Sequence, residues 1–295
     1  MADSTAEFLT TKELADLLRL KERKVYELAA SGEVPCSRAT GKLLFPRQAV
    51  DAWVARHSSG LTSDRPAKRT QVFLGSHDPL LDWSLRASGT ELATFFDGSL
   101  DGLERFGRGA GVATGLHLYE PGSGDWNLAI VRARFGHAPV ALLEFAWRER
   151  GLVVAPGNES TFGHMAALKG QRVVPRQGAS GSQVLLQHLM EQVGLDSSEV
   201  EWSETARTES EAALAVLEGK ADAALGLRAI AEQLRLGFVP LLRERFDLLV
   251  DRAAWFDPPL QRLFDFCRSS AFLARAAELA GYDVSGFGRV HFNGG

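Results

Sequence analysis

The strongest constraint on the fold of this chain is the alternation of short apolar runs with amphipathic stretches after residue 71. In QRVVPRQGASGSQVLLQHLMEQVGL, at 171–195, an apolar strand pattern is followed by small residues and then by apolar residues at helical spacing. Similar units begin near residues 71 and 91. Strands that alternate with helices in this way form a parallel sheet covered by helices. The sequence therefore predicts an α/β fold, with room for two lobes in about 225 residues.

The charge of the chain changes sign near residues 58–70. Residues 1–70 hold 12 Lys and Arg against 9 Asp and Glu, whereas the rest of the chain holds 21 against 28. The stretch SSGLTSDRPAKRT between these parts is polar and lacks apolar periodicity, which is typical of a linker. We therefore predict a small basic domain at 1–57, a linker at 58–70 and a larger acidic domain at 71–295.

Several classes of protein are disfavoured by the composition. No apolar run approaches the roughly 20 residues of a membrane helix, and MADSTAEFLT at the start has neither the basic nor the apolar part of a secretory signal. Cys36 and Cys267 are far apart and in no metal-binding spacing. We expect a cytoplasmic protein with free thiols, no membrane association, no metal and no cofactor.

The basic domain has the sequence pattern of a helix-turn-helix. LTTKELADLLRL begins with Thr10 and has Glu13 three residues later, the spacing of a helix capping box. The sequence then predicts a second helix over 21–35, a two-stranded wing over 36–45 and a third helix over 46–57.

Residues 8–55 resemble the excisionase-type, MerR-like winged helix-turn-helix. The matching stretches are Leu9-Thr10, Glu13-Leu14-Ala15, Val25-Tyr26-Glu27-Leu28, Ser31-Gly32-Glu33-Val34-Pro35 and Val50-Asp51-Ala52-Trp53. Arg19 departs from the pattern, because the family commonly has glycine in that turn. The wing is usually more basic than Leu43-Leu44. The resemblance implies binding to double-stranded DNA.

The basic side chains of this domain fit that expectation. Lys21, Arg23 and Lys24 open the second helix, whose N-terminal residues would reach base edges in the major groove. An isolated helix with such charges is more often a solvated face, but this order of motifs favours DNA contact. The predicted DNA contacts are Thr11, Lys21, Arg23, Lys24, Tyr26, Arg38, Lys42 and Arg47. Because one small domain with few positive charges binds DNA weakly, we expect a homodimer on paired half-sites.

Small polar residues in the acidic domain mark three expected helix starts. They are Gly75-Ser76-His77-Asp78, Gly98-Ser99 and Ser180-Gly181-Ser182. Free backbone N–H groups and the helix dipole favour an anion at such places, and open α/β sheets bind ligands beyond the carboxyl ends of their strands. The same serines also suit the role of N-caps. Their convergence in one fold would make an anion site.

Residues 71–292 resemble substrate-binding-protein-like domains related to molybdate and tungstate receptors, in the form that is fused to helix-turn-helix regulators. The matching stretches are 75–78, 98–103, 115–118, 151–158, 219–226 and 244–248. The resemblance implies a periplasmic-binding-protein-like (type II) fold, in which two α/β lobes hold the ligand in a cleft and the chain crosses between them twice.

The stretch 175–183 departs from that family. Pro175, Gly178, Ala179, Ser182 and Gln183 stand where the family has Asn, a basic residue, Gly, Thr and Arg. This predicts a site with less cationic charge, which would bind an oxyanion such as molybdate or tungstate through neutral donors, or a less charged organic metabolite. The predicted ligand contacts are Ser76, His77, Asp78, Ser99, His117, Arg176, Ser180, Gly181, Ser182 and Asp222.

We therefore predict a ligand-responsive transcription regulator in which closure of the lobes changes DNA affinity. An enzyme that uses the cleft is the alternative, but it would need a nucleophile with a base, or a metal. The stretch 178–182 is not a G-x-S-x-G elbow, and His77 and His117 lack metal-ligand spacing. A transport receptor would have no use for residues 8–55. The operator and the sign of regulation do not follow from the sequence.

Overall fold

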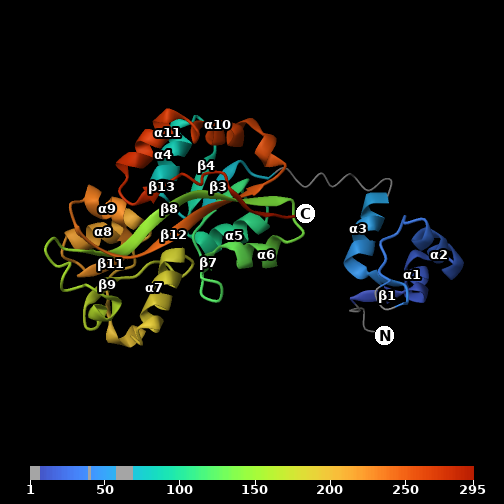
Figure 1. The fold of residues 1–295 in the computed structure, drawn as a ribbon, viewed down its shortest axis with the longest axis horizontal. Coiled ribbons are helices and arrows are strands. Elements are labelled where there is room, and N and C mark those ends of the chain that lie inside the picture. Colours follow the sequence, from blue (N-terminus) through green and yellow to red (C-terminus); the bar gives the residue numbers. More distant parts are fainter. Residues whose placement is uncertain (1–6, 39–40, 58–68) are drawn as a thin grey trace. The chain divides into compact units, whose positions relative to one another are not determined.

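The computed structural model describes residues 7–38, 41–57 and 69–295. The chain divides into two units, Met1–Pro66 and Ala67–Gly295 (Figure 1). Most of the predicted linker at 58–70 lies outside the described residues. None of the helices in the described part of the chain has the length and apolar content needed to span a bilayer.

The N-terminal unit contains a helix-turn-helix. Its elements are β1 (Phe8–Thr10), α1 (Thr11–Leu18), α2 (Glu22–Ala30), β2 (Leu44–Pro46) and α3 (Arg47–His57). β1 pairs with β2 in antiparallel register, and Leu14, Val25 and Val50 bring one face of each helix into a common core. The capping box predicted at the start of α1 is confirmed, because the Glu13 N–H donates to Thr10 Oγ1 at 3.3 Å and the Thr10 N–H donates to Glu13 Oε2 at 2.7 Å.

The turn after α1 takes the conformation that explains why a glycine is common there. Arg19 ends α1 with φ 54° and ψ 41°, the left-handed conformation that suits glycine best. Further along, Ser37 and Leu44 exchange two backbone hydrogen bonds of 2.7 and 3.0 Å. The tip of the predicted wing, at 39–40, lies outside the described residues.

The larger unit alternates strands with helices. Its strands are β3 (Val72–Gly75), β4 (Ala93–Phe96), β5 (Ala113–Leu116), β6 (Tyr119–Glu120), β7 (Asp125–Trp126), β8 (Val140–Val154), β9 (Arg172–Val174), β10 (Glu201–Trp202), β11 (Ala223–Leu227), β12 (Gly237–Asp251), β13 (Tyr282–Asp283) and β14 (Val290–Asn293). Its α-helices are α4 (Pro79–Ala87), α5 (Ser99–Gly107), α6 (Leu128–Phe135), α7 (Gly181–Gln192), α8 (Glu209–Leu217), α9 (Arg228–Gln233), α10 (Pro258–Phe266) and α11 (Ser270–Glu278). The predicted α/β class is confirmed.

One sheet runs through this unit in the order β10-β9-β11-β8-β12-β5-β3-β4 (Figure 1). The strands β3, β4 and β5 are parallel to one another, and so are β9, β10 and β11. β8 and β12 are antiparallel to each other, with Val140 opposite Asp251 and Val154 opposite Gly237. Each of these 15-residue strands therefore has one end in each lobe, and the chain crosses between the lobes twice.

Each lobe has its own apolar core. In the first lobe, Leu80 of α4 and Leu263 of α10 pack in one cluster with Phe145 of β8. In the second lobe, Leu185 of α7 packs with Leu225 of β11. Because every fully buried aliphatic side chain contributes roughly 1.5–3 kcal/mol, these cores stabilise the two lobes that carry the strand ends.

Candidate functional site

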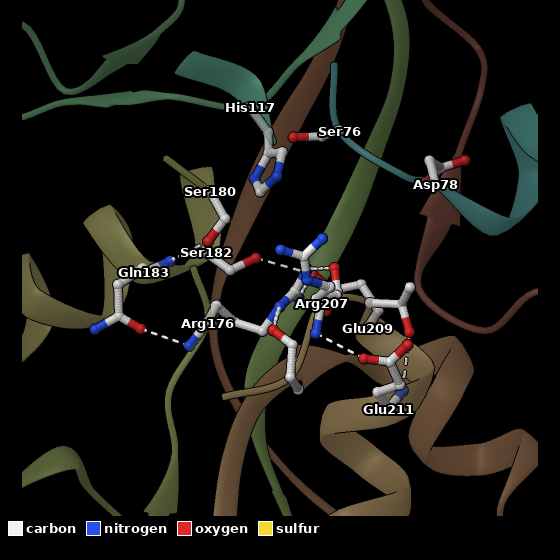
Figure 2. Close-up of polar contacts among 12 residues, drawn as sticks. Ser76, Asp78, His117, Arg176, Ser180, Ser182, Gln183, Arg207, Glu209 and Glu211 are labelled. Atoms are coloured by element: carbon white, nitrogen blue, oxygen red, sulfur yellow. Dashed lines mark hydrogen bonds and ion pairs between the residues drawn. The ribbon is translucent and has the colours of Figure 1, made fainter. Parts of the chain in front are cut away.

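The first lobe brings two buried serines to the place where the lobes meet. Ser76 follows β3, and Ser99 is the first residue of α5. Their hydroxyl oxygens are 2.8 Å apart, and the His117 backbone N–H donates to Ser99 Oγ at 3.1 Å. Figure 2 shows Ser76 beside His117, facing the start of α7. The segments that follow β3 and β4 thus supply neutral hydrogen-bonding groups.

The second lobe brings the stretch RQGASGSQ to the same place. Ser180 is the N-cap of α7 and accepts from the Gln183 N–H at 3.1 Å. Ser182 donates to Glu209 Oε1 at 2.8 Å. The Arg176 guanidinium donates to Glu209 Oε1 at 2.8 Å, while Gln183 Oε1 accepts from the Arg176 backbone N–H at 2.7 Å (Figure 2). Gln183 therefore fixes the backbone that carries Arg176.

The crossing strands add two arginines and one carboxylate. Arg148 and Arg150 of β8 and Glu244 of β12 are all buried. Arg148 donates to Asp78 Oδ2 at 2.7 Å and pairs with Glu244. Arg150 Nη1 lies 3.1 Å from Glu209 Oε2 and 3.4 Å from Glu244 Oε1.

Three further contacts complete this polar network. Arg150 Nη2 also donates to Ser182 Oγ. The Tyr282 hydroxyl donates to Asp78 Oδ2 at 2.6 Å, and His117 Nδ1 is 3.1 Å from Glu244 Oε2. We call these side chains the inter-lobe network: Ser76, Asp78, Ser99, His117, Arg148, Arg150, Arg176, Ser180, Ser182, Glu209, Glu244 and Tyr282.

The two lobes touch directly beside this network. The Leu100 N–H in the first turn of α5 donates to the Ala179 carbonyl at 3.0 Å. A Cβ atom on Gly98 would lie 2.7 Å from that carbonyl oxygen, and one on Gly181 would lie 2.7 Å from the His117 carbonyl oxygen. Because real Cβ atoms do not approach so closely, glycine at both positions permits the contact between the lobes.

Two acids of the network, Glu209 and Glu244, are held in their charged form. Burial opposes the charge on Glu209, but Arg150 and Arg176 keep its pKa well below the ordinary value. Burial likewise opposes the charge on Glu244, and Arg148 and Arg150 bring its pKa down to about 2. Burial lowers the pKa of His117, which favours the neutral imidazole at pH 7. Three arginines, Arg148, Arg150 and Arg176, pair with these two acids and with Asp78.

The network contains cationic groups that lie outside the stretch 175–183. Arg148 and Arg150 supply the charge that the stretch 175–183 lacks, and neither was among the predicted contacts. Their signal in the sequence was their period-two spacing inside an apolar strand, which places both on one face. Glu209 and Glu244 were also missed. Glu244 lies in a long strand pattern that also holds Asp247 and Asp251, whereas nothing local marks Glu209 as buried.

Most of the predicted ligand contacts are brought together. Ser76, Asp78, Ser99, His117, Arg176, Ser180 and Ser182 belong to the inter-lobe network, and Gly181 lies against His117. His77 instead faces the Phe96 ring, with 5.7 Å between ring centroids, and lies 3.9 Å from Asp82. Asp222 stands at the amino end of β11 and pairs with Arg172 at 2.7 Å, so the structure does not bring it to the network.

The predicted DNA contacts differ in accessibility. Lys21, Arg23, Lys24, Tyr26 and Lys42 are exposed. Arg23 and Lys24 both pair with nearby Glu27, at 3.4 and 3.5 Å.

The other three predicted DNA contacts already have local roles. Thr11 is buried at the start of α1. Arg38 donates to the Ala29 carbonyl at 3.1 Å, and Arg47 lies 3.3 Å from Asp51. The exposed set at the start of α2 is therefore the better candidate interface.

These features define a helix-turn-helix joined to a two-lobed binding-protein domain. Residues 83–268 match the model of the PBP superfamily domain, and residues 8–58 match that of a helix-turn-helix domain. Since the first match spans more than half of the chain, this protein belongs to the PBP superfamily. The two domains point to a non-enzymatic regulator that binds DNA and a small molecule. Within the described residues, no group of His, Cys, Asp and Glu is arranged to hold a metal ion.

Two individual proteins are similar to this chain in sequence. The chain is 24% identical over 299 residues to the uncharacterized protein YvgK of Bacillus subtilis (strain 168), covering 95% of this chain and 96% of that protein. It is 28% identical over 109 residues to an uncharacterized protein encoded in the 5′ region of the ferredoxin 2Fe-2S gene of Clostridium pasteurianum, covering 36% and 96%.

Solved structures show a similar fold for the larger unit. A structure from Clostridium perfringens, described as a phosphate ABC transporter substrate-binding protein with bound phosphate, has a TM-score of 0.53 at 12% identity. The match covers 72% of this chain and 99% of that one. At this identity the likeness is one of fold alone, and it agrees with the predicted two-lobed architecture.

Proposed function

We propose that this protein is a transcription regulator whose domain at 71–295 binds a small anion and whose domain at 1–57 binds DNA as part of a homodimer. The observation that carries the proposal is the inter-lobe network. Arg148 and Arg150 of β8 contact Asp78 in the first lobe and Ser182 in the second. Ser76 and Ser99 add two hydroxyls that contact each other in the first lobe. Groups of this kind bind oxyanions and carboxylates, and a ligand that touches both lobes favours their closed state.

The favoured ligand is a small oxyanion such as molybdate or tungstate. Ser76 and Ser99 offer hydroxyls from the first lobe, and Ser180 and Ser182 offer them from the second. The resemblance to receptors of these oxyanions supports the choice, as does the phosphate bound by the similar fold from Clostridium perfringens.

The second candidate is a regulator that senses a less charged organic metabolite. One observation favours it: the three arginines of the network already have three acidic partners, Asp78, Glu209 and Glu244. A fully paired network has no net positive charge to attract a dianion.

Titration calorimetry on the full chain distinguishes these candidates. Molybdate, tungstate, sulfate and phosphate are titrated into wild type, Ser99→Ala and Ser88→Ala. We expect binding of at least one oxyanion, weakened about tenfold by Ser99→Ala through the loss of one hydrogen bond. Ser88→Ala, at the end of α4, is the control and should leave affinity unchanged. Binding of neutral compounds alone would favour the second candidate.

The link to DNA has its own test. Genomic fragments that bind the protein are selected, and their affinity is measured with and without saturating ligand. Typical coupling between two sites is about 1–3 kcal/mol, or 5- to 150-fold in affinity. Equal DNA affinity with and without ligand would refute the regulatory part of the proposal, even if the protein binds both DNA and the ligand.

A further inference from the structure

The side chain of Glu209 takes an unusual course for the first residue of a helix. Thr208 caps α8, accepting from the Glu211 N–H at 3.1 Å. An acid in the first turn usually remains near its own helix end, where the dipole favours it. Glu209 instead extends to the start of α7 and is only 3% exposed, whereas its neighbour Glu211 is exposed and accepts from the Arg207 N–H at 2.7 Å (Figure 2).

The Glu209 carboxylate is surrounded as a bound anion would be. Oε1 accepts from Ser182 Oγ and from Arg176 Nη1, both at 2.8 Å. Oε2 lies 3.1 Å from Arg150 Nη1. Two arginines and a hydroxyl at a helix start are the donors that proteins use for oxyanions and carboxylates. The anion position that the stretch RQGASGSQ predicts is therefore filled by a group of the protein itself.

The Glu209 carboxylate does not use all the hydrogen-bond donors of the arginines around it. Arg150 Nε and Arg148 Nε are buried, yet neither has a hydrogen-bond acceptor among the residues that the structure describes. The ion pair between Arg150 Nη1 and Glu209 Oε2 also lacks hydrogen-bond geometry. A buried guanidinium with unused donors is costly, so an anion with more oxygen atoms than a carboxylate would satisfy this arginine better.

We infer that Glu209 is a built-in competitor, which occupies the anion position at the start of α7 and leaves it when the ligand binds. This inference rests on the proposed function, because it concerns the same site. The ligand must carry negative charge: a neutral molecule in place of Glu209 would leave Arg150 and Arg176 buried without a counter-ion. Exchange of one anion for another keeps the network paired, and it moves the start of α8.

The inference makes Glu209→Gln a variant with raised anion affinity. Glutamine has the same shape but no charge, so it competes poorly with an incoming anion. An opposite charge at this distance shifts an ionisation equilibrium by about one to three powers of ten. We expect affinity for molybdate or phosphate to rise about 10- to 1,000-fold. Glu211→Gln, on the same helix but outside the network, should bind as wild type does.

Thermal unfolding supplies a second readout, which reports the stability of the variant and not its affinity. Without anions, Glu209→Gln should melt at a lower temperature than wild type, because Arg150 and Arg176 lose their partner. Sodium formate, sodium phosphate or sodium molybdate should restore the melting temperature by binding to the folded state, with a much smaller effect on wild type and Glu211→Gln. Absence of this rescue by all three salts would overturn the inference.

Hydrogen exchange on wild type tests the movement itself. Saturation with molybdate or phosphate should reduce protection of the backbone amides at 206–212 while protection of 181–192 rises or is unchanged. If wild type binds an anion but Glu209→Gln binds it with equal affinity, the competitor role is wrong and the proposed function stands. If only Glu209→Gln binds anions, the competitor role stands and the anion-sensing function of wild type fails.

Discussion

The two units of this chain use their arginines in opposite ways. In α2, Arg23 leaves 91% of its side chain exposed and pairs with Glu27 four residues away. In β8, Arg148 and Arg150 are buried and pair with acids that are 59 or more residues away, such as Arg150 with Glu209 and Arg148 with Asp78. Exposed pairs are worth little because water and salt screen them. The charged side chains of α2 can therefore leave Glu27 and bind another group, such as DNA. The arginines of β8 are instead needed to neutralise buried acids of the fold.

Removal of a buried arginine should give the largest loss of unfolding free energy. Arg148→Ala leaves Asp78 buried without the arginine it pairs with and leaves Glu244 with Arg150 alone, which should cost about 3–5 kcal/mol of unfolding free energy. Arg86→Ala removes an exposed partner of Asp82 in α4 and should change that free energy by less than about 0.5 kcal/mol. Denaturant titrations measure both variants. Similar losses of unfolding free energy in the two variants would contradict the distinction between exposed and buried arginines.

Asp247 of β12 should give the larger unit a pH-dependent stability. Burial raises the pKa of Asp247 to about 7, against the opposing effect of Arg245 and the Asn127 amide. Since the folded state holds a proton that the unfolded state releases near pH 4, stability should fall as pH rises from about 4 to about 7, by up to about 4 kcal/mol. Glu244 has the opposite sign: its pKa is lowered to about 2, so its contribution is present above about pH 4.5 and is lost below it.

Asp247→Asn is the matched variant for this pH dependence. The amide resembles the protonated acid in shape and cannot ionise, so the fall in unfolding free energy between pH 5 and pH 8 should disappear. Urea titrations at several pH values measure the slope. An equally steep fall in Asp247→Asn would assign the pH dependence to other groups.

The exposed charges of α2 should affect DNA binding without affecting stability. Arg23→Ala and Lys24→Ala should each weaken binding to a selected genomic site by about 1–3 kcal/mol where the side chain contacts a base. Each lost phosphate contact should lower the salt slope by about one unit. Arg268→Ala removes an exposed charge of the larger unit, paired with Asp265, and serves as control. Unchanged DNA affinity in both α2 variants would remove this helix from the proposed interface.

The smallest effect is expected at Arg19, which is strained rather than paired. Its φ of 54° costs a non-glycine residue roughly 1 kcal/mol. Arg19→Gly relieves this strain but gives the unfolded chain more freedom, so we expect a net stabilisation of about 0.5 kcal/mol. Ser31 ends α2 with φ −76°, and Ser31→Gly should give no gain. Thermal unfolding of the two variants is the measurement, and a loss of stability in Arg19→Gly would contradict the strain argument.

Features encoded by neighbouring residues could be predicted from the sequence. The capping box of Thr10 and Glu13, the N-cap Ser180 and the alternation of strands and helices each depend on residues a few positions apart. The pairing of Arg150 with Glu209 could not be predicted, because it depends on how β8 and α8 meet in space. The remote position of Asp222 was foreseeable, since it precedes a strand and the network lies at the carboxyl ends.

The long strands β8 and β12 also set the order in which the lobes are completed during synthesis. The second lobe is one continuous stretch between them, whereas the first lobe needs β12, α10 and α11 from the last part of the chain. β5 pairs with β12 along Ala113–Leu116, so this edge has no partner until residues 247–250 leave the ribosome. Long-range strand pairing of this kind is slow and leaves edges open to aggregation. The first lobe begins earlier in the chain than the second. Because it needs β12, it is nevertheless the last lobe to complete its fold.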